Sequence, residues 1–226
     1  QEAYQCGPAS LAMMMRHQGR PVLPDELVDQ VFIEARQGSL QAEMLAATRR
    51  QNLLPYVHDN RFSTLLEEVE AGNPVLVFQN LGFGFYPVWH YAVVIGYDLN
   101  DRQVVLHSGT TYRLERSFRR FELEWQGGDY WAMTMHRPGA FPVTAEPIPY
   151  LDASAGLEEA GRYDAAALAY QAATERWPDQ LIAWLGLGNV RYRQQQFEQA
   201  QLAYQQAIRL DAGSAAAHHN LAWALM

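Results

Sequence analysis

The first part of the chain combines two kinds of hydrophobic pattern. Apolar residues at helical spacing predict helices at residues 7–17, 24–32, 40–50, 63–71 and 118–125. Short apolar runs predict strands at residues 53–57, 74–79, 90–97, 103–107 and 129–135. Ser39, Ser63 and Ser117 are expected to be N-caps, and Pro55 places the first strand at a sheet edge. Because helices come first and most strands follow, we expect an α+β domain with helices packed on an antiparallel sheet.

Prolines then interrupt the pattern, and everything after them is helical. The cluster comprises Pro138, Pro142, Pro147 and Pro149, so we expect a linker at residues 138–149 between a first domain at 1–137 and a second at 150–226.

The second domain repeats with a period of 34 residues. Trp184, Leu187 and Gly188 recur as His218, Leu221 and Ala222. The motif Trp184-x-x-Leu187-Gly188, followed by Ala200-x-x-x-Tyr204 and Ala207, resembles the tetratricopeptide (TPR) repeat. Ala212 stands where the repeat usually has proline, and Tyr192 lies one position after the usual aromatic.

This resemblance predicts an all-α repeat domain of about 2.5 units: residues 147–180, 181–214 and a part from 215 onward. It also implies a protein partner in the groove of the repeats. The last helix shows Leu221, Trp223 and Leu225 on an apolar edge that does not suit a capping helix, so we expect that the chain is truncated at Met226 or that this edge is covered.

Cys6 is the only cysteine and immediately precedes a helix that has Pro8 in its first turn. Unpaired N–H groups and the positive end of the helix dipole there favour a thiolate. Gln1 and Gln5 supply amide donors of the kind that an oxyanion hole needs, and Gly7 allows close approach of a substrate. An inert, buried thiol is the alternative, and a partner histidine decides between them.

His90 is the best candidate for that partner among the seven histidines. It opens a buried strand after a loop that carries Tyr86 and Trp89, which we expect to line a substrate cleft with Gly7. His17 and His58 lie near element ends, where we expect a surface position. No histidine has zinc-ligand spacing around Cys6, so we expect neither a metal nor another cofactor.

Cys6-Gly-Pro-Ala-Ser and Trp89-His-Tyr-Ala-Val-Val-Ile-Gly-Tyr together resemble the papain-like cysteine peptidases of the C39 type, which mature bacteriocin or peptide leaders or stand alone as C39-like peptidases. The resemblance covers roughly residues 1–140. It implies a thiolate–imidazolium pair of Cys6 and His90, with Gln1 as the oxyanion residue and Gln5 as its alternative. The resemblance also implies that the protein is a bacterial hydrolase that cleaves a peptide or protein substrate.

The third catalytic position departs from the family pattern, which has an acidic or amide residue on the strand after the histidine strand. Here that position falls on His107, beside Ser108. His107 or Ser108 could orient His90, Asp98 could reach it from the turn, or the site could be a dyad. Amidase, deamidase or transferase chemistry and a non-catalytic scaffold are the alternatives to proteolysis.

The net charge of −8 argues against a nucleic-acid footprint and against attraction to anionic lipid surfaces. No apolar run is long enough to cross a membrane, and a single cysteine excludes an internal disulfide. Because the chain opens inside a functional motif, we expect an upstream leader or anchor and a place in the bacterial periplasm or envelope.

Overall fold

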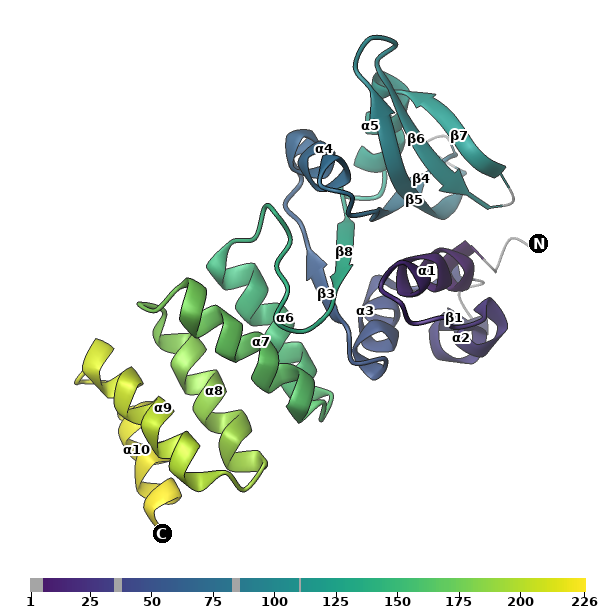
Figure 1. Ribbon diagram of the computed structural model, residues 1–226. Coiled ribbons are helices and arrows are strands. Elements are labelled where there is room, and N and C mark those ends of the chain that lie inside the picture. The colour runs from purple at the N-terminus through teal and green to yellow at the C-terminus, as the bar shows by residue number, and fades with distance from the viewer. Residues whose placement is uncertain (1–5, 35–37, 83–85, 110) are drawn as a thin grey trace. The chain divides into compact units, whose positions relative to one another are not determined.

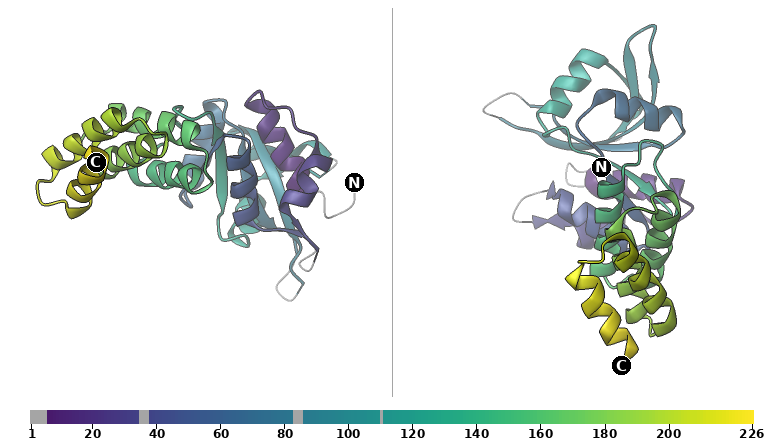
Figure 2. Two further views of the ribbon diagram at one scale, coloured as in Figure 1. Left: turned by 90° about the horizontal axis from the view of Figure 1, so that it is seen from below. Right: turned by 90° about the vertical axis from the view of Figure 1, so that its left-hand side faces the viewer.

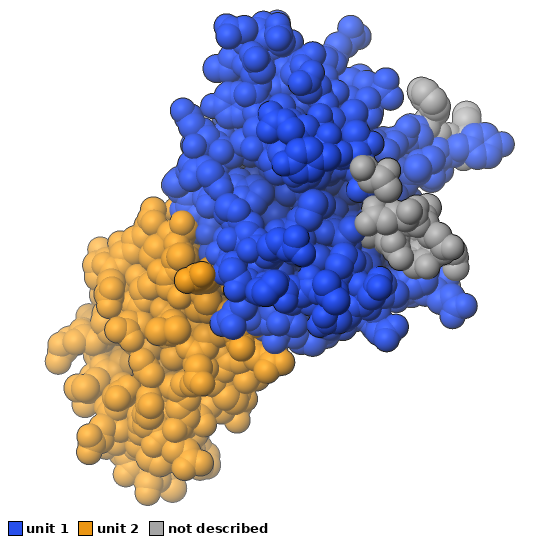
Figure 3. Space-filling model, turned by 45° about the vertical axis from the view of Figure 1, so that its right-hand side comes forward, with its two compact units in different colours: residues 1–51, 55–136, 142–144 blue, residues 52–54, 137–141, 145–226 orange. Residues whose placement is uncertain are grey.

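The computed structural model describes residues 6–34, 38–82, 86–109 and 111–226. It divides into two compact units (Figure 3). Unit 1 comprises residues 1–51, 55–136 and 142–144, and unit 2 comprises residues 52–54, 137–141 and 145–226.

Unit 1 contains five helices among its described residues: α1 (Cys6–His17), α2 (Pro24–Val31), α3 (Gln41–Arg50), α4 (Phe62–Glu70) and α5 (Phe118–Gln126). All five predicted helices are therefore confirmed. Two of the predicted caps are wrong, because Leu40 and Arg61 precede α3 and α4 in place of Ser39 and Ser63. Ser39 belongs instead to a short strand, and Ser63 lies inside α4, which begins earlier because Phe62 packs on Phe118 and Phe121.

The main sheet of unit 1 has the strand order β3-β8-β4-β5-β6-β7 (Figure 1). Its strands are β3 (Leu54–Val57), β4 (Val75–Asn80), β5 (Trp89–Asp98), β6 (Gln103–Ser108), β7 (Thr111–Ser117) and β8 (Ala132–His136). β4 pairs antiparallel with β5 and β8, and β6 pairs antiparallel with β5 and β7. β3 lies at the edge, as Pro55 predicts. A separate ladder joins β1 (Phe32–Ile33) to β2 (Gly38–Ser39).

The sheet carries helices on both faces. On one face Val77, Ala92 and Val94 form a core with α4 and α5, where Phe121 and Trp125 are fully buried. On the other face Tyr91 donates its hydroxyl to the carbonyl of Ser39, and α1 packs along β5. Side chains of successive β5 residues point to opposite faces, so from Trp89 to Val94 odd positions face α1 and even positions face α5. A register shift between Val94 and Gly96 changes this order, and Tyr97 packs on the α5 side.

Unit 2 is entirely helical from residue 147 onward: α6 (Pro147–Glu159), α7 (Tyr163–Arg176), α8 (Leu181–Arg193), α9 (Phe197–Leu210) and α10 (Ala215–Leu225). Each helix packs on the next along the chain, as Figure 2 shows. The helices begin and end in the 34-residue register, which confirms the helical-repeat prediction. Small residues allow close packing: Gly186 lies against the Tyr170 ring, and Gly188 lies against the Tyr204 ring.

The residues of the predicted linker are divided between the two units. Pro142–Thr144 belongs to unit 1, and Pro147 already begins α6. Among the described helices, none has the length and apolar character needed to cross a membrane.

Candidate active site

Cys6 is the first residue of α1 and carries a free, half-buried thiol. Gly7 and Pro8 follow in the first turn, where backbone N–H groups have no partner within the helix. Gly7 is buried, and a Cβ at this position would collide with the Ser39 side chain. The structure therefore gives Gly7 a packing contact, and its place in a substrate cleft stays a prediction.

His90 is the second residue of β5 and lies opposite Gln79 in the β4–β5 ladder. Its Nε2 is 2.8 Å from Ser108 Oγ, which leaves Nδ1 for another partner. Burial lowers the pKa of His90, and the nearby Glu124 carboxylate acts in the opposite sense. Glu124 is itself buried and held by Arg120, with Oε1 2.8 Å from the arginine Nε.

Ser108, and not His107, makes the hydrogen bond to His90. In the β5–β6 ladder Ser108 lies opposite Ala92, on the even face that His90 shares, whereas His107 lies opposite Val93 on the other face. His107 stacks on Tyr112 at 4.4 Å between ring centroids.

Asp98 stands at the far end of β5 from His90. Eight residues of extended strand separate the two, which is roughly 26 Å. Its Oδ1 accepts the N–H groups of Asn100 and Asp101 and so stabilises the turn that follows. Asp98 therefore does not contact the His90 ring.

Cys6 approaches β5 at Tyr91, the neighbour of His90. Burial raises the pKa of the Tyr91 hydroxyl, and an electrostatic interaction with Cys6 acts in the same direction, so the thiol lies close to that side chain. Between the described side chains of Cys6 and His90 there is no hydrogen bond. The alternation along β5 places His90 on the face of Ala92 and Val94, which packs on α5, whereas Cys6 lies near Tyr91 on the face toward α1. The described geometry therefore does not form the Cys6–His90 pair, which stays a prediction.

Of the remaining predicted residues, Trp89 is the first residue of β5 and Tyr86 comes three residues before it. Gln1 and Gln5 are outside the described residues. Trp89 stacks on Phe78 with 5.2 Å between ring centroids and is 52% exposed, while Tyr86 is 83% exposed. Asn80 Oδ1 accepts the N–H of Val88 at 2.9 Å and so fixes the end of the loop before β5.

A cavity of about 530 Å³ lies farther along α1. Its walls include Met13 and His17 from α1, Val93 and Ile95 from β5, and His107 and Tyr112. Met13 is seven residues after Cys6, or about 10 Å along the helix. His107 thus lines this cavity and not the surroundings of His90.

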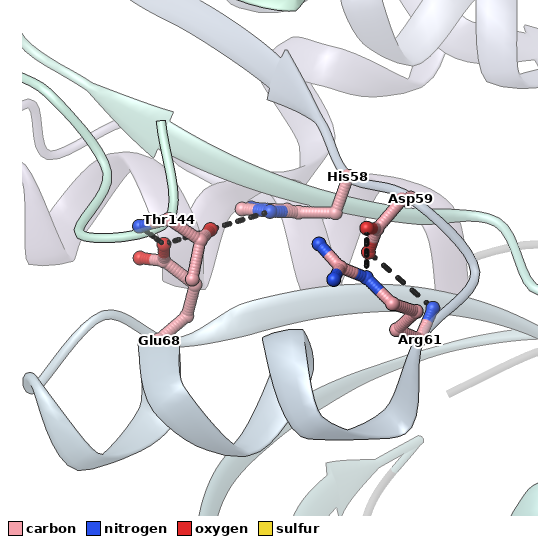
Figure 4. A network of polar contacts seen from close by, with 5 residues as sticks. All are labelled: His58, Asp59, Arg61, Glu68 and Thr144. Carbon is pink, nitrogen blue, oxygen red and sulfur yellow. Dashed lines mark hydrogen bonds and ion pairs between the residues drawn. The ribbon is translucent and has the colours of Figure 1, made fainter. Parts of the chain in front are cut away.

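A buried polar network connects β3, α4 and the segment before α6 (Figure 4). Thr144 donates its N–H to Glu68 Oε1 at 2.8 Å, and its hydroxyl donates to the same oxygen. The hydroxyl oxygen of Thr144 also lies 3.4 Å from His58 Nδ1. Asn73 donates to the other oxygen of Glu68. Burial acts to raise the pKa of Glu68, but the Thr144 and Asn73 hydrogen bonds lower it below its usual value.

The surface position predicted for His58 is wrong. His58 is only 8% exposed, and burial lowers its pKa to about 4. Its Nε2 shares the Thr134 hydroxyl with Nε2 of His136, each at 2.8 Å, and burial lowers the pKa of His136 to about 4 as well. His58 follows an edge strand, but its N–H still bonds to the carbonyl of Ala132, and its ring has buried partners in Thr134 and Thr144.

The described residues contain no group of three or more His, Cys, Asp or Glu side chains placed to hold a metal ion. The described side chains near the start of β5 include the imidazole of His90 and the hydroxyl of Ser108, and the free thiol of Cys6 lies near Tyr91.

Comparisons with known proteins follow the same division of the chain. The model of the tetratricopeptide repeat family matches residues 156–215 and 185–226. The peptidase domain of Streptococcus ComA, a bi-functional ABC transporter involved in a quorum-sensing pathway, has a TM-score of 0.49 at 21% identity, covering 60% of this chain and 93% of that chain. A protein from Bacillus anthracis described as a C39-like peptidase has a TM-score of 0.47 at 17% identity, covering 58% and 88%.

No curated protein matches the chain. The model of the Peptidase_C39 like family matches residues 1–129, which is more than half of the sequence. With a papain-like α+β domain before its tetratricopeptide repeats, the chain belongs to the C39-like peptidase family.

Proposed function

We propose that the chain is a cysteine peptidase of the C39-like type that uses Cys6 as its nucleophile. The thiolate of Cys6 attacks a peptide carbonyl, and His90 first holds the thiol proton and then gives it to the leaving amine. Water then hydrolyses the acyl-enzyme. Gln1, or Gln5 in its place, and a backbone N–H near Cys6 stabilise the oxyanion.

The observation that carries this proposal is the place of Cys6. It is the first residue of a helix that packs along β5, the strand that begins with Trp89 and His90. The hydrogen bond between His90 Nε2 and Ser108 Oγ supports it further, because a base that is held at one ring nitrogen can present the other to the thiol. Ser108 is accordingly the orienting residue in this proposal, and the repeats recruit a protein substrate or partner.

A non-catalytic docking role is the second candidate. It is favoured by the hydroxyl of Ser108 in the place of an acidic third residue and by the lack of a Cys6–His90 hydrogen bond among the described atoms. In that case the first domain binds without cleaving, and the repeats recruit the partner.

Alkylation of Cys6 by iodoacetamide at about pH 6 separates the two candidates, because an unperturbed thiol is almost fully protonated there. Cys6 is the only cysteine, so mass spectrometry of the whole chain measures its reaction alone. We expect the wild-type chain to react at least about tenfold faster than His90→Ala. His218→Ala, which removes an exposed histidine in unit 2, is the control and should react like the wild type. Equal rates for wild type and His90→Ala would reject the activated thiolate.

A further inference from the structure

Unit 2 has a cavity of about 330 Å³ on the side where α6, α8 and α10 succeed one another. Three aromatic rings contribute to its wall, from Tyr192, Tyr204 and Trp223. Glu158 brings a carboxylate from α6, and Arg193 brings a guanidinium from the end of α8. Aromatic rings around a carboxylate are an arrangement that attracts cations, because the ring faces and the carboxylate both carry negative potential.

The Glu158 carboxylate is short of partners. It is half-buried and accepts one hydrogen bond, from the Tyr170 hydroxyl at 3.3 Å, although a carboxylate offers about four acceptor sites. Arg193 makes no ion pair with it among the described residues. Burial raises the pKa of Glu158, and Tyr170 and Arg193 lower it only in part. A donor that enters the cavity would therefore meet a carboxylate that is desolvated but not yet paired.

The walls around this carboxylate are held in place. Asn189 Oδ1 accepts the Tyr204 hydroxyl at 3.0 Å and the Asn220 side-chain amide at 2.9 Å, which ties α8 to α9 and α10. The Trp223 indole N–H donates to His219 at 3.0 Å, which restrains a ring that is 53% exposed. A pocket with fixed walls loses little conformational entropy when it binds.

We propose that this pocket binds a cationic side chain, lysine or arginine, of the protein that the repeats recruit. The cation pairs with Glu158 and lies against the rings of Tyr192 and Trp223, while the exposed Arg193 side chain moves toward solvent. The net charge of −8 favours the approach of a basic partner. The inference rests on the proposed recruiting role of the repeats and not on the chemistry of Cys6.

The whole chain can be titrated against fluorescein-labelled Gly/Ser peptides that differ only in one central residue: arginine, lysine, norleucine or glutamate. Fluorescence anisotropy should show the arginine and lysine peptides binding about tenfold tighter than the norleucine peptide, with the glutamate peptide weakest. Glu158→Gln keeps an acceptor for Tyr170 and should weaken the two cationic peptides about tenfold without affecting norleucine. Trp223→Leu should weaken the same two peptides.

Arg193→Gln provides a test of opposite sign. It removes the competing cation, so the arginine and lysine peptides should bind more tightly. Glu175→Gln is the matched control, since it makes the same charge change as Glu158→Gln at an exposed position on α7, outside the cavity. This control should bind all four peptides as the wild type does.

Three outcomes would overturn the proposal. Tightest binding of the glutamate peptide, lost in Arg193→Gln, would make the pocket an anion site. Equal affinity for norleucine and arginine would make it simply apolar. No binding of any peptide at millimolar concentration would mean that the cavity takes no such side chain. Failure of the Cys6 alkylation test would leave these results unaffected, so the two proposals fail separately.

Discussion

Ser108 occupies a position where a single residue decides how the proposed base is held. Replacing it by aspartate would put a carboxylate beside His90 Nε2, and a carboxylate there stabilises the imidazolium. We expect Ser108→Asp to raise the pKa of His90 by about one unit or more, and Ser108→Ala to slow Cys6 alkylation severalfold. A pH titration of the His90 ring resonance by NMR measures the first effect.

The neighbouring histidine offers the control for this experiment. His107 points to the other face of the sheet and stacks on Tyr112, so His107→Ala should leave the His90 titration unchanged. A large shift in His107→Ala, together with none in Ser108→Asp, would instead make His107 the orienting residue. The sequence could not decide between these two, because a shift of one residue along a strand moves a side chain to the opposite face.

At the scale of the helices, the contact between α8 and α9 depends on Gly188. A Cβ at Gly188 would overlap the ring of Tyr204, which is buried and hydrogen-bonded to Asn189. Alanine gains about 1 kcal/mol of helix propensity over glycine, but overpacking costs about 1–3 kcal/mol. We therefore expect Gly188→Ala to lower the thermal unfolding midpoint of unit 2, as measured by far-UV circular dichroism.

Gly213→Ala is the comparison for Gly188→Ala. Gly213 lies in the turn before α10, and its added Cβ would come no closer than 3.3 Å to the side chain of Asp211. This variant should unfold within a degree or two of the wild type. If Gly188→Ala were equally mild, the Gly–Tyr packing would not limit the stability of the repeat.

The elements that were predicted correctly have a strong local signal. The apolar run at β5 predicts a strand by itself, and the 34-residue repeat of unit 2 predicts its helices by itself. β7 was missed because Thr111–Ser117 has no buried residue and carries two arginines and a glutamate, so only its pairing with β6 makes it a strand. Sequence patterns record what a segment buries, and an exposed edge strand buries little.

At the scale of the whole molecule, contacts between distant residues decide features of the site and of the domain boundary that local sequence patterns could not predict. His58, Glu68, Thr134 and Thr144 are far apart in the sequence, and only the folded unit brings them into one network. Cys6 and His90 could be selected by motif, because each opens an element of clear type. What holds His90, and where unit 1 ends, depend on side chains whose partners are distant in the chain.

The end of unit 1 can be tested with two fragments, residues 1–137 and residues 1–146. The shorter fragment ends where the proline cluster begins, as the sequence predicts. The longer fragment keeps Thr144, which gives the buried Glu68 carboxylate two hydrogen bonds. Hydrogen bonds to a charged group contribute about 1.5–3 kcal/mol, and a buried carboxylate left with fewer donors is costly. We expect the shorter fragment to be less stable by about 2–3 kcal/mol in urea unfolding at neutral pH.

Thr144→Val in the longer fragment refines this comparison, because valine keeps the backbone N–H and removes only the hydroxyl. Its stability should fall between those of the two fragments, since Glu68 would retain the bond from the residue 144 backbone at 2.8 Å. The loss should also shrink as the pH falls through the pKa of Glu68, because a protonated carboxyl no longer needs the donors. Equal stability of all three proteins would mean that residues 142–144 do not stabilise unit 1, and that the prolines mark its true end.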